Sequence, residues 1–511
     1  NNQTIEDLDI SNNELGVQGA SLLWGEIQHN ANMKRVNISS NSLGDAGILC
    51  MREFLTNNQN IEVLDLADNG IGPEGMGIVS QAIKAYSTLK QLFLRNNRIG
   101  CEGTKKLKKF LRNNDRLEVI DLRDNHIGTR GANYLFKALK EKKNIIHLSI
   151  AHNTIEVEGL RYFVDFLLSN HSLISLDLSG NFLGVGGAYW LGKVSSDVKK
   201  LDSINLSGNF LADEAMINVA NFLKRTPNIS TLNLAKNKIS PEGATALNEG
   251  LKEHIHLTHL DFSRNLLGDS GVAALSESLN KNRHLENICF SSNLIEFEGA
   301  EIMANALENH RRIRILRMSE NNIGPSGMEA LSKILGGNPY IEELDFAFND
   351  IGTEGACALF ETIQENDMLR RLHLNSNNIS GRGIKLLESF LHNHEMIEIL
   401  DLGCNKIGNE GANWLGKALK DNKSIKVLNL RNNSIRSEGA KKLKDLFANN
   451  QRIQEIDFAR NMLGMEGGQD LFKSIKQDKN LRRVDVSHNQ IGDEGVAALE
   501  GFLSNNLLLE Y

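Results

Sequence analysis

One motif recurs every 28 residues along this chain of 511, and that regularity limits the possible folds more than any other feature of the sequence. In the third copy the motif reads LDLADNGIGPEG, from Leu64 to Gly75. A fixed period of this length indicates units that stack on their neighbours, so the sequence predicts a solenoid of 18 repeats of 28 residues. The copies are marked by one asparagine each: Asn13, Asn41, Asn69, Asn97, Asn125, Asn153, Asn181, Asn209, Asn237, Asn265, Asn293, Asn321, Asn349, Asn377, Asn405, Asn433, Asn461 and Asn489.

Each copy is expected to contain a short strand followed by a helix. Leu64 and Leu66 are two residues apart, so their side chains point to one side of a strand and Asp65 points to the other. Apolar and small residues at helical spacing follow the last glycine of the motif. Proline favours the first turn of a helix. It occupies the same slot, just before that glycine, at Pro73, Pro241 and Pro325.

The stacking of these units determines the predicted architecture. Consecutive strands are always joined through a helix, so they must pair in parallel. Helices are ~10 Å wide and strands lie ~4.8 Å apart, so the stack must bend with its strands inside. We therefore predict an α/β horseshoe with a concave parallel β-sheet and convex α-helices, formed by residues 1–511 as a single continuous array. In this fold the repeated asparagine is expected to satisfy backbone groups that the turn buries.

Charge and composition exclude several classes of function. The net charge is −7 and the pI is about 6.1, so we expect no nucleic acid and no anionic membrane surface among the partners. The five cysteines are odd in number and occupy different repeat positions, which favours reduced thiols in the cytoplasm. No signal-peptide pattern and no membrane-spanning apolar run is present. Neither end shows the polar cap that a solenoid needs, so we expect a fragment of a longer chain.

The pattern LxxLxLxxNxIGxxGxxxLxxxL, which covers the whole chain, resembles the leucine-rich repeat of the ribonuclease-inhibitor subtype. That resemblance implies the α/β horseshoe and, in most members, recognition of other proteins. Members include ribonuclease inhibitor, the sensor domains of NOD-like receptors, the GTPase-activating protein of Ran and subunits of the axonemal nexin–dynein regulatory complex. The chain has fewer cysteines than ribonuclease inhibitor, and it has more repeats than the Ran activator and no acidic tail. The resemblance thus implies the fold and leaves the partner open.

The residue between the two strand leucines faces the concave side and is aspartate in nine of the 18 copies. From Asp345 to Asp457 aspartate falls on every second repeat. Aspartates on adjacent strands would lie ~5 Å apart, and this alternation doubles the distance between like charges. Asp457 and Asp485 break this alternation, and we expect Arg483 to offset them. Aspartate is either the default strand residue, paired with nearby arginines, or part of a cradle for a basic protein segment. The concave residues proposed to bind a partner are Phe93, Arg317, Asp345, Asp401, Asp457 and Asp485.

A second candidate surface is the rim formed by the loops. The residue after the key asparagine is usually polar, but copies seven to eleven carry mostly apolar residues there, and further apolar residues follow in the same loops. A line of exposed apolar side chains marks a contact site, whereas side chains folded back onto adjacent loops would only seal the core. The rim residues proposed to bind a partner are Phe182, Phe210, Leu266, Leu294 and Phe297.

Signals for catalysis are weak. Residues 187–193 and 411–417 have the glycine and lysine spacing of a P-loop but lack its Ser/Thr and fall inside the expected helix. No catalytic, metal or cofactor-binding motif appears, so we expect neither enzyme activity nor a small-molecule substrate. The most irregular unit is the eighth, with Ala212 and Ala215 in place of glycines and the polar run Ser195–Asp197 before it, which indicates either a local weak point or simple drift.

We therefore predict a cytoplasmic, non-enzymatic scaffold that binds a partner protein by its concave face and loop rim. Two alternatives remain open. The chain is alternatively a GTPase-activating or regulatory protein for a small GTPase, or a structural subunit of a large assembly such as the axoneme, which would place it with the cytoskeleton or a cilium.

Overall fold

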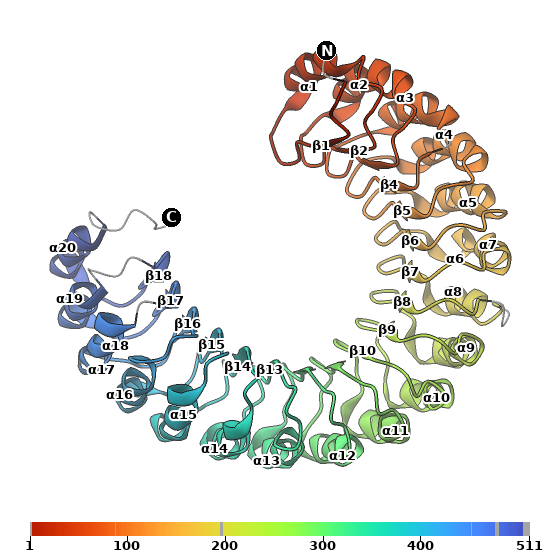
Figure 1. Cartoon of the computed structure of the whole chain (residues 1–511). Helices are drawn as coiled ribbons and strands as arrows, with labels where there is room; N and C mark the ends of the chain where they lie inside the picture. The colour runs from red at the N-terminus through yellow and green to blue at the C-terminus, as the bar shows by residue number, and fades with distance from the viewer. Residues whose placement is uncertain (1–2, 87, 195–197, 451, 476–479, 504–511) are drawn as a thin grey trace. The chain divides into compact units, whose positions relative to one another are not determined.

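The computed structural model describes residues 3–86, 88–194, 198–450, 452–475 and 480–503, and it divides the chain into two compact units, Asn1–Leu257 (unit 1) and Thr258–Tyr511 (unit 2). Each unit repeats the order strand, turn, helix, turn (Figure 1). The alternation of strand and helix predicted from the motif is confirmed. Whether the repeats continue from one unit into the next as a single array stays a prediction.

Every strand has three residues and carries the apolar residue of the motif at its centre. The strands of unit 1 are β1 (Asp7–Asp9), β2 (Arg35–Asn37), β3 (Val63–Asp65), β4 (Gln91–Phe93), β5 (Val119–Asp121), β6 (His147–Ser149), β7 (Ser175–Asp177), β8 (Ser203–Asn205) and β9 (Thr231–Asn233). Those of unit 2 are β10 (His259–Asp261), β11 (Asn287–Cys289), β12 (Ile315–Arg317), β13 (Glu343–Asp345), β14 (Arg371–His373), β15 (Ile399–Asp401), β16 (Val427–Asn429), β17 (Glu455–Asp457) and β18 (Arg483–Asp485).

In each repeat the first helix begins about nine or ten residues after the start of the strand. Unit 1 contains α1 (Gly16–Ile27), α2 (Gly44–Asn57), α3 (Pro73–Ala82), η1 (Ile83–Ala85), α4 (Gly100–Asn113), α5 (Gly128–Leu139), α6 (Glu156–Gly159), α7 (Phe163–Ser169), α8 (Gly184–Leu191), α9 (Ala212–Arg225) and α10 (Pro241–Leu251). Unit 2 contains α11 (Gly268–Lys281), α12 (Phe297–Leu307), α13 (Gly324–Leu335), α14 (Gly352–Thr362), η2 (Ile363–Glu365), α15 (Gly381–Asn393), α16 (Gly408–Leu419), α17 (Ser437–Lys442), α18 (Lys444–Asn449), α19 (Gly464–Ile475) and α20 (Gly492–Leu503).

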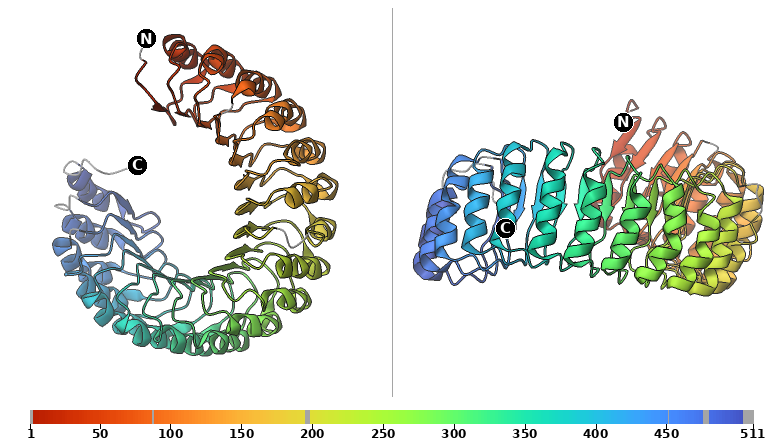
Figure 2. Two further views of the ribbon diagram at one scale, coloured as in Figure 1. Left: turned by 45° about the vertical axis from the view of Figure 1, so that its right-hand side comes forward. Right: turned by 90° about the horizontal axis from the view of Figure 1, so that it is seen from below.

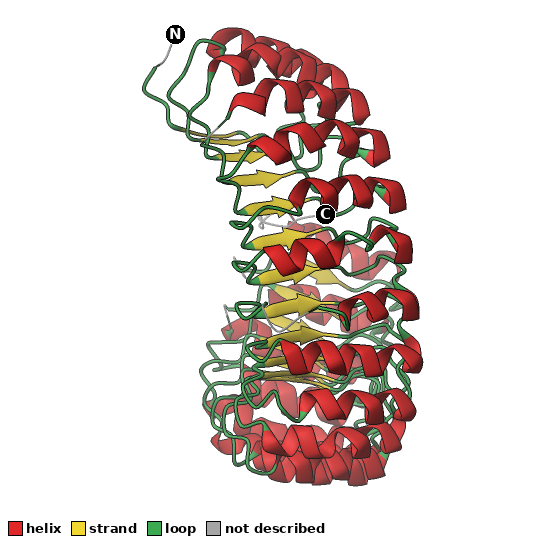
Figure 3. Cartoon of the chain, turned by 90° about the vertical axis from the view of Figure 1, so that its right-hand side faces the viewer, coloured by secondary structure: helices red, strands yellow, loops and turns green. Residues whose placement is uncertain are grey.

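Within each unit, neighbouring strands pair in parallel and in a register of one repeat. Leu64 of β3, for example, lies opposite Leu92 of β4, and Leu344 of β13 lies opposite Leu372 of β14. The strands form an inner layer and the helices an outer layer (Figure 3; a second view is given in Figure 2). Corresponding residues of successive repeats therefore form columns, and side chains at the same motif position become neighbours.

The core lies between these two layers. Leu64 and Leu66 are fully buried, as is Ile71 of the following turn, while Asp65 between the two leucines is only half-buried on the concave side. Met76 and Val79 of α3 meet them from the helix side. The predicted direction of the strand side chains is thus confirmed.

The repeated asparagine links each turn to the turn before it. The Asn153 side-chain nitrogen donates to the carbonyl oxygens of Leu122 (2.8 Å), Ile150 (3.0 Å) and Ala151 (2.9 Å). Its side-chain oxygen accepts the backbone N–H groups of Asn125 (3.0 Å) and Ile127 (3.2 Å) from the preceding repeat. These groups are buried, so the predicted structural role of the asparagine is confirmed.

Two other features of the motif have the expected structural causes. The prolines at 73, 241 and 325 all lie in the first turn of a helix. At Gly131, a Cβ atom would lie 3.2 Å from the Cα of Cys101 in the preceding repeat and 2.6 Å from a methyl carbon of Ile127. The glycine therefore lets consecutive helices approach closely.

A second polar column follows the ends of the helices and was not predicted from the sequence. Asn114 donates to the carbonyl oxygens of Tyr86 and Leu89 (3.1 and 3.2 Å) and accepts the N–H groups of Arg116 and Leu117 (both 2.8 Å). A histidine replaces this asparagine in some repeats. At His394 the ring Nε2 lies 2.7 Å from the Asn366 carbonyl oxygen, and Nδ1 accepts the N–H groups of the next turn.

The irregular eighth unit is only partly described. Ser195–Asp197 lies outside the described residues. Ala212 takes a left-handed backbone conformation (φ 55°) in the slot that glycine usually occupies and begins α9, which is fully helical to Arg225.

Candidate functional site

The residue that ends each strand on the concave side has a structural task in addition to its charge. In all nine aspartate copies, a carboxylate oxygen accepts the backbone N–H of the residue two positions later, as Asp401 does from Gly403 at 3.0 Å. Asparagine makes the same bond in four copies, at Asn37, Asn205, Asn233 and Asn429. The acceptor oxygen holds the end of the strand, and the negative charge is not needed for that purpose.

The acids of unit 2 differ in how far they are neutralised. Glu343 of β13 is only 5% exposed and lies between two arginines. Its carboxylate oxygens are 2.6 Å from Arg317 Nε and 3.0 Å from an Arg371 nitrogen. Burial acts to raise the pKa of Glu343, but the hydrogen bonds and charge of the two arginines outweigh it and lower that pKa. Arg317, predicted as a binding residue, is therefore already engaged.

Asp457 and Asp485 share a different arginine from the one expected. One Arg431 nitrogen lies 3.7 Å from a carboxylate oxygen of Asp457 and 3.8 Å from one of Asp485. Arg431 follows β16 and bridges both carboxylates, so the expectation that Arg483 offsets this pair was incomplete: the charge of Arg483 acts on Asp485, but Arg431 makes the direct contacts. Burial acts to raise the pKa of Asp485, but the Ser487 hydrogen bonds and the charges of Arg431 and Arg483 lower it.

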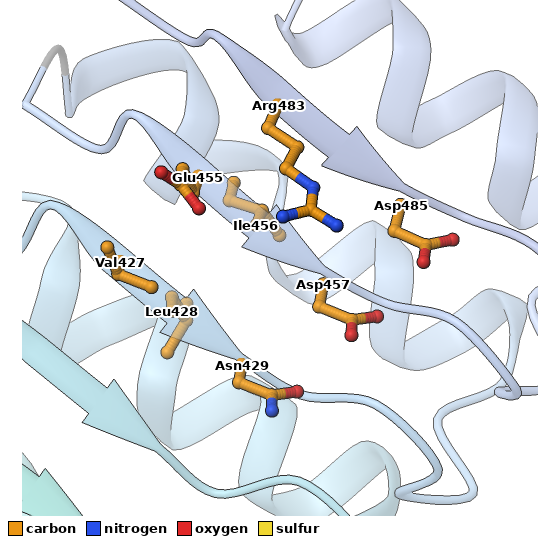
Figure 4. Close-up of a pocket in the computed structure, with 8 residues that line it drawn as sticks. All are labelled: Val427, Leu428, Asn429, Glu455, Ile456, Asp457, Arg483 and Asp485. Atoms are coloured by element: carbon orange, nitrogen blue, oxygen red, sulfur yellow. The ribbon is translucent and has the colours of Figure 1, made fainter. Parts of the chain in front are cut away.

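Arg483 also lines a small hollow on the concave face of unit 2. The hollow has a volume of about 160 Å³ and lies over β16, β17 and β18. Figure 4 shows the guanidinium of Arg483 extending over Ile456, with Glu455 on one side and the carboxylates of Asp457 and Asp485 on the other.

Like Asp261, the concave acids Asp345 and Asp401 of unit 2 have no lysine or arginine partner among the described residues. They lie on either side of His373, which is paired in register with both. Among the described residues, no lysine or arginine nitrogen lies within 4.0 Å of either carboxylate. Burial raises the pKa of Asp401, and the negative charges of Asp457 and Asp345 add to that effect. The charge on Asp401 is therefore held at a cost that a bound cation would relieve.

Of the four aspartates that end strands in unit 1, Asp121 is the one with an arginine or lysine nitrogen within 4.0 Å among the described residues. Arg123 makes a hydrogen-bonded ion pair with Asp121 at 2.6 Å, and Asp121 is almost fully buried. Phe93, predicted to bind a partner, lies on β4 between Asp65 and Asp121 and is half-buried. Phe93 belongs to unit 1, and its binding role stays a prediction.

The rim residues of unit 1 form one contact. The rings of Phe182 and Phe210 stack nearly parallel, with centroids 5.6 Å apart. Both side chains remain about half exposed. The rings therefore cover each other's faces and leave their edges in solvent.

The rim residues of unit 2 are also exposed. Leu266, Leu294 and Phe297 are 49%, 65% and 49% exposed. The structure adds three exposed rim side chains that were not predicted: Phe348, Met462 and Met465. Met462 has the same motif position as Leu294, so its exposure could have been predicted from the 28-residue spacing.

The described residues contain no group of three or more His, Cys, Asp or Glu side chains placed to hold a metal ion. Over the same residues, no helix is both long and apolar enough to cross a membrane.

Comparisons with known proteins agree with the repeat architecture. A family model described as "Leucine Rich repeat" matches thirteen segments that together span more than half of the chain: residues 1–23, 29–51, 57–77, 114–136, 169–191, 227–247, 253–276, 310–332, 337–360, 365–387, 393–413, 421–444 and 477–499. None of the curated proteins matches the chain in sequence.

Several solved structures are similar to it at low sequence identity. A plant peptide hormone receptor, RGFR1 in complex with RGF2, is 16% identical over 99% of this chain and 95% of that one, with a TM-score of 0.33. A TDR receptor is 15% identical over 93% and 80%, with a TM-score of 0.41. The mouse RP105/MD-1 complex is 14% identical over 95% and 91%, with a TM-score of 0.47. At TM-scores below 0.5, these likenesses do not indicate a shared ligand.

Proposed function

Because the chain belongs to the leucine-rich repeat family, whose fold is typical of protein–protein interaction, we propose that it is a non-enzymatic scaffold that binds a basic segment of a partner protein. The binding surface is the concave face of unit 2. The observation that supports this most directly is the pair of carboxylates, Asp345 and Asp401, that lie on this face without a lysine or arginine partner among the described residues.

The electrostatics favour a cation at this place. Asp401 lies two strands from Asp345 and two strands from Asp457, and the charges of both raise its pKa. A lysine or arginine that reaches His373 would lie next to two carboxylates at once. Hydrogen bonds to charged groups stabilise a complex by about 1.5–3 kcal/mol each. Two such contacts would make a large share of the affinity of a short peptide.

Conversion of aspartate to asparagine tests this proposal without disturbing the fold. Asparagine keeps the oxygen that accepts the N–H two residues later, as Asn429 does in the same slot. We expect the double variant Asp345→Asn/Asp401→Asn to bind a fluorescent arginine- and lysine-rich 12-residue peptide about 10- to 100-fold more weakly than the parent chain. Each asparagine still accepts a neutral hydrogen bond, so each contact loses about 1 kcal/mol rather than its whole contribution. Fluorescence anisotropy at two salt concentrations measures this.

The matched control is Asp9→Asn/Asp177→Asn, which removes two charges from the same motif position in unit 1. This variant has the same net charge as the test variant, so non-specific attraction changes equally in both. Equal loss of affinity in the two variants would mean that only net charge matters, and unchanged affinity in the test variant would refute a basic segment on this face.

We infer further that the repeats are of the ribonuclease-inhibitor subtype and that the protein acts in the cytoplasm. The uniform 28-residue period and the α-helix in each repeat support the subtype. All five cysteines are free thiols, which supports a reducing compartment. Fractionation of cells that produce the tagged protein tests the compartment, and recovery in a secreted or membrane fraction would contradict it.

A further inference from the structure

A second exposed surface lies on the seventh and eighth repeats of unit 1. It combines the stacked rings of Phe182 and Phe210 with three apolar side chains on the helices that follow. Val185 and Tyr189 lie one helical turn apart on α8, and Ile217 takes the position of Tyr189 on α9. These five side chains, which we call the aromatic band, are 42–51% exposed: Phe182, Val185, Tyr189, Phe210 and Ile217.

The two phenylalanines occupy a backbone position that suits other residues better. Phe182 and Phe210 are left-handed, with φ of 56° and 53°. Most of the column adopts this conformation, Gly70, Ser434 and Asn378 as well as Leu294, and small or Asx residues tolerate it better than bulky ones. Two adjacent repeats thus combine an unfavourable backbone with an exposed ring, a combination that is found at functional sites.

Lysines border the aromatic band at two places. Lys238 lies over the ring of Phe210 with its nitrogen 5.1 Å from the ring centre, and Lys193 lies over Tyr189 at 4.8 Å. The nearest acids on α9 differ in availability. Asp213 accepts bonds from Ser240 and Gly243 of the next repeat, so its charge is already used, whereas Glu214 is exposed. Both lysines lie directly over rings of the aromatic band, whereas the exposed acids Glu214 and Glu242 lie in the first turns of α9 and α10. The ring faces themselves therefore favour anionic groups.

We propose that the aromatic band docks an acidic amphipathic segment of a partner protein. Its apolar side chains cover the two phenylalanines and Tyr189, and its aspartates and glutamates meet Lys193 and Lys238. This surface lies in unit 1 and selects the opposite charge from the concave face of unit 2. It is therefore a second binding site, independent of the proposed site for a basic segment.

The test uses the full chain and a defined probe. The probe is a fluorescent 16-residue peptide with Leu or Phe at i, i+3, i+4 and i+7 and Glu elsewhere, compared with a scrambled peptide of the same composition and with a basic version in which Lys replaces Glu. We expect the acidic amphipathic peptide to bind best. Phe182→Asn/Phe210→Asn should weaken it on the order of tenfold or more, because central aromatic contacts dominate interfaces.

Asparagine is chosen because Asn378 adopts the same left-handed conformation in this column (φ 59°). The variant should therefore unfold at a temperature close to that of the parent chain. A control variant, Leu22→Asn, removes a side chain on α1 that is 75% exposed and lies outside the aromatic band, and it should bind the peptide as the parent does.

A charge reversal gives a second, separate test. Lys193→Glu/Lys238→Glu leaves both phenylalanines in place and should shift the preference from the acidic to the basic peptide. Unchanged affinity in this variant overturns the proposal, and it also decides the matter if the asparagine variant fails to fold. Equal binding of the scrambled peptide overturns it as well. If the asparagine variant instead lowers self-association in sedimentation and leaves peptide binding unchanged, the band contacts a second copy of this chain and the proposal is wrong.

Discussion

The asparagine column makes a strong prediction about stability, which Asn153→Ala tests. Asn153 is fully buried and its side chain takes part in five hydrogen bonds with backbone groups of two repeats. Removal of the side chain leaves some of these five backbone groups with another hydrogen-bond partner and others without one. The loss of unfolding free energy can therefore be estimated bond by bond.

The three carbonyl oxygens keep another donor. The Leu122 oxygen still accepts from the Asn125 side chain at 3.1 Å, and the Ile150 oxygen still accepts from Asn181 at 2.9 Å. The Ala151 oxygen keeps the N–H of Asp124 at 3.0 Å.

The two N–H groups, of Asn125 and Ile127, have no other acceptor among the described residues. A buried donor left unsatisfied costs about 1–3 kcal/mol, so the variant should lose about 2–6 kcal/mol of unfolding free energy.

Urea unfolding followed by circular dichroism measures this loss, and hydrogen exchange localises it to the amides of Asn125 and Ile127. The control is Asn60→Ala, in which an exposed asparagine loses a single bond of 2.8 Å to the Ala31 oxygen and should cost less than about 1 kcal/mol. If Asn153→Ala costs no more than this control, water satisfies the two amides and the column does not hold the repeats together.

Four further predictions concern charge. Asp401→Asn should unfold at an equal or higher urea concentration at pH 7, because the pKa of Asp401 is raised by burial and its charge is unfavourable in the fold. The difference in stability between the variant and the parent chain should vanish as pH falls, because the Asp401 carboxyl of the parent is then protonated. A variant less stable than the parent at pH 7 would contradict this prediction. The pKa of His310 is lowered by burial to about 4, so stability present above pH 6.5 should fall by up to about 3 kcal/mol towards pH 4. Burial lowers the pKa of His394 too, so His394→Asn should keep the fold and make its stability less sensitive to acid. Thermal unfolding measured over a range of pH tests this, and a pH profile identical to that of the parent chain would refute it. Glu343→Gln should cost about 1–3 kcal/mol in urea unfolding, because Arg317 and Arg371 lose their shared carboxylate, and a neutral result would show that this network is not stabilising.

Some of the structural roles were within reach of the sequence and others were not. The exposure of Leu294 was predicted from its motif position, directly after the repeated asparagine. The same position also predicts the exposure of Met462. The hydrogen bond that holds the end of each strand could have been inferred from the exchange of Asp for Asn at this position. The 28-residue spacing of His394 from Asn366 and Asn422 also shows that it takes the place of an asparagine, but the spacing does not show that both ring nitrogens meet backbone groups of two turns.

The sequence alone determined the parallel strands, the layer of helices and the membership of every column, because a 28-residue period places equivalent residues one strand apart. That is why Asp345 and Asp401 could be assigned to one face in advance. Only the tertiary structure decided which of these charges are neutralised. Arg431 reaches two carboxylates across neighbouring strands, and Glu343 binds two arginines. Asp401 has no lysine or arginine partner among the described residues. The physical reason is that periodicity specifies where each side chain begins, whereas ion pairing depends on where its charged end lies after packing.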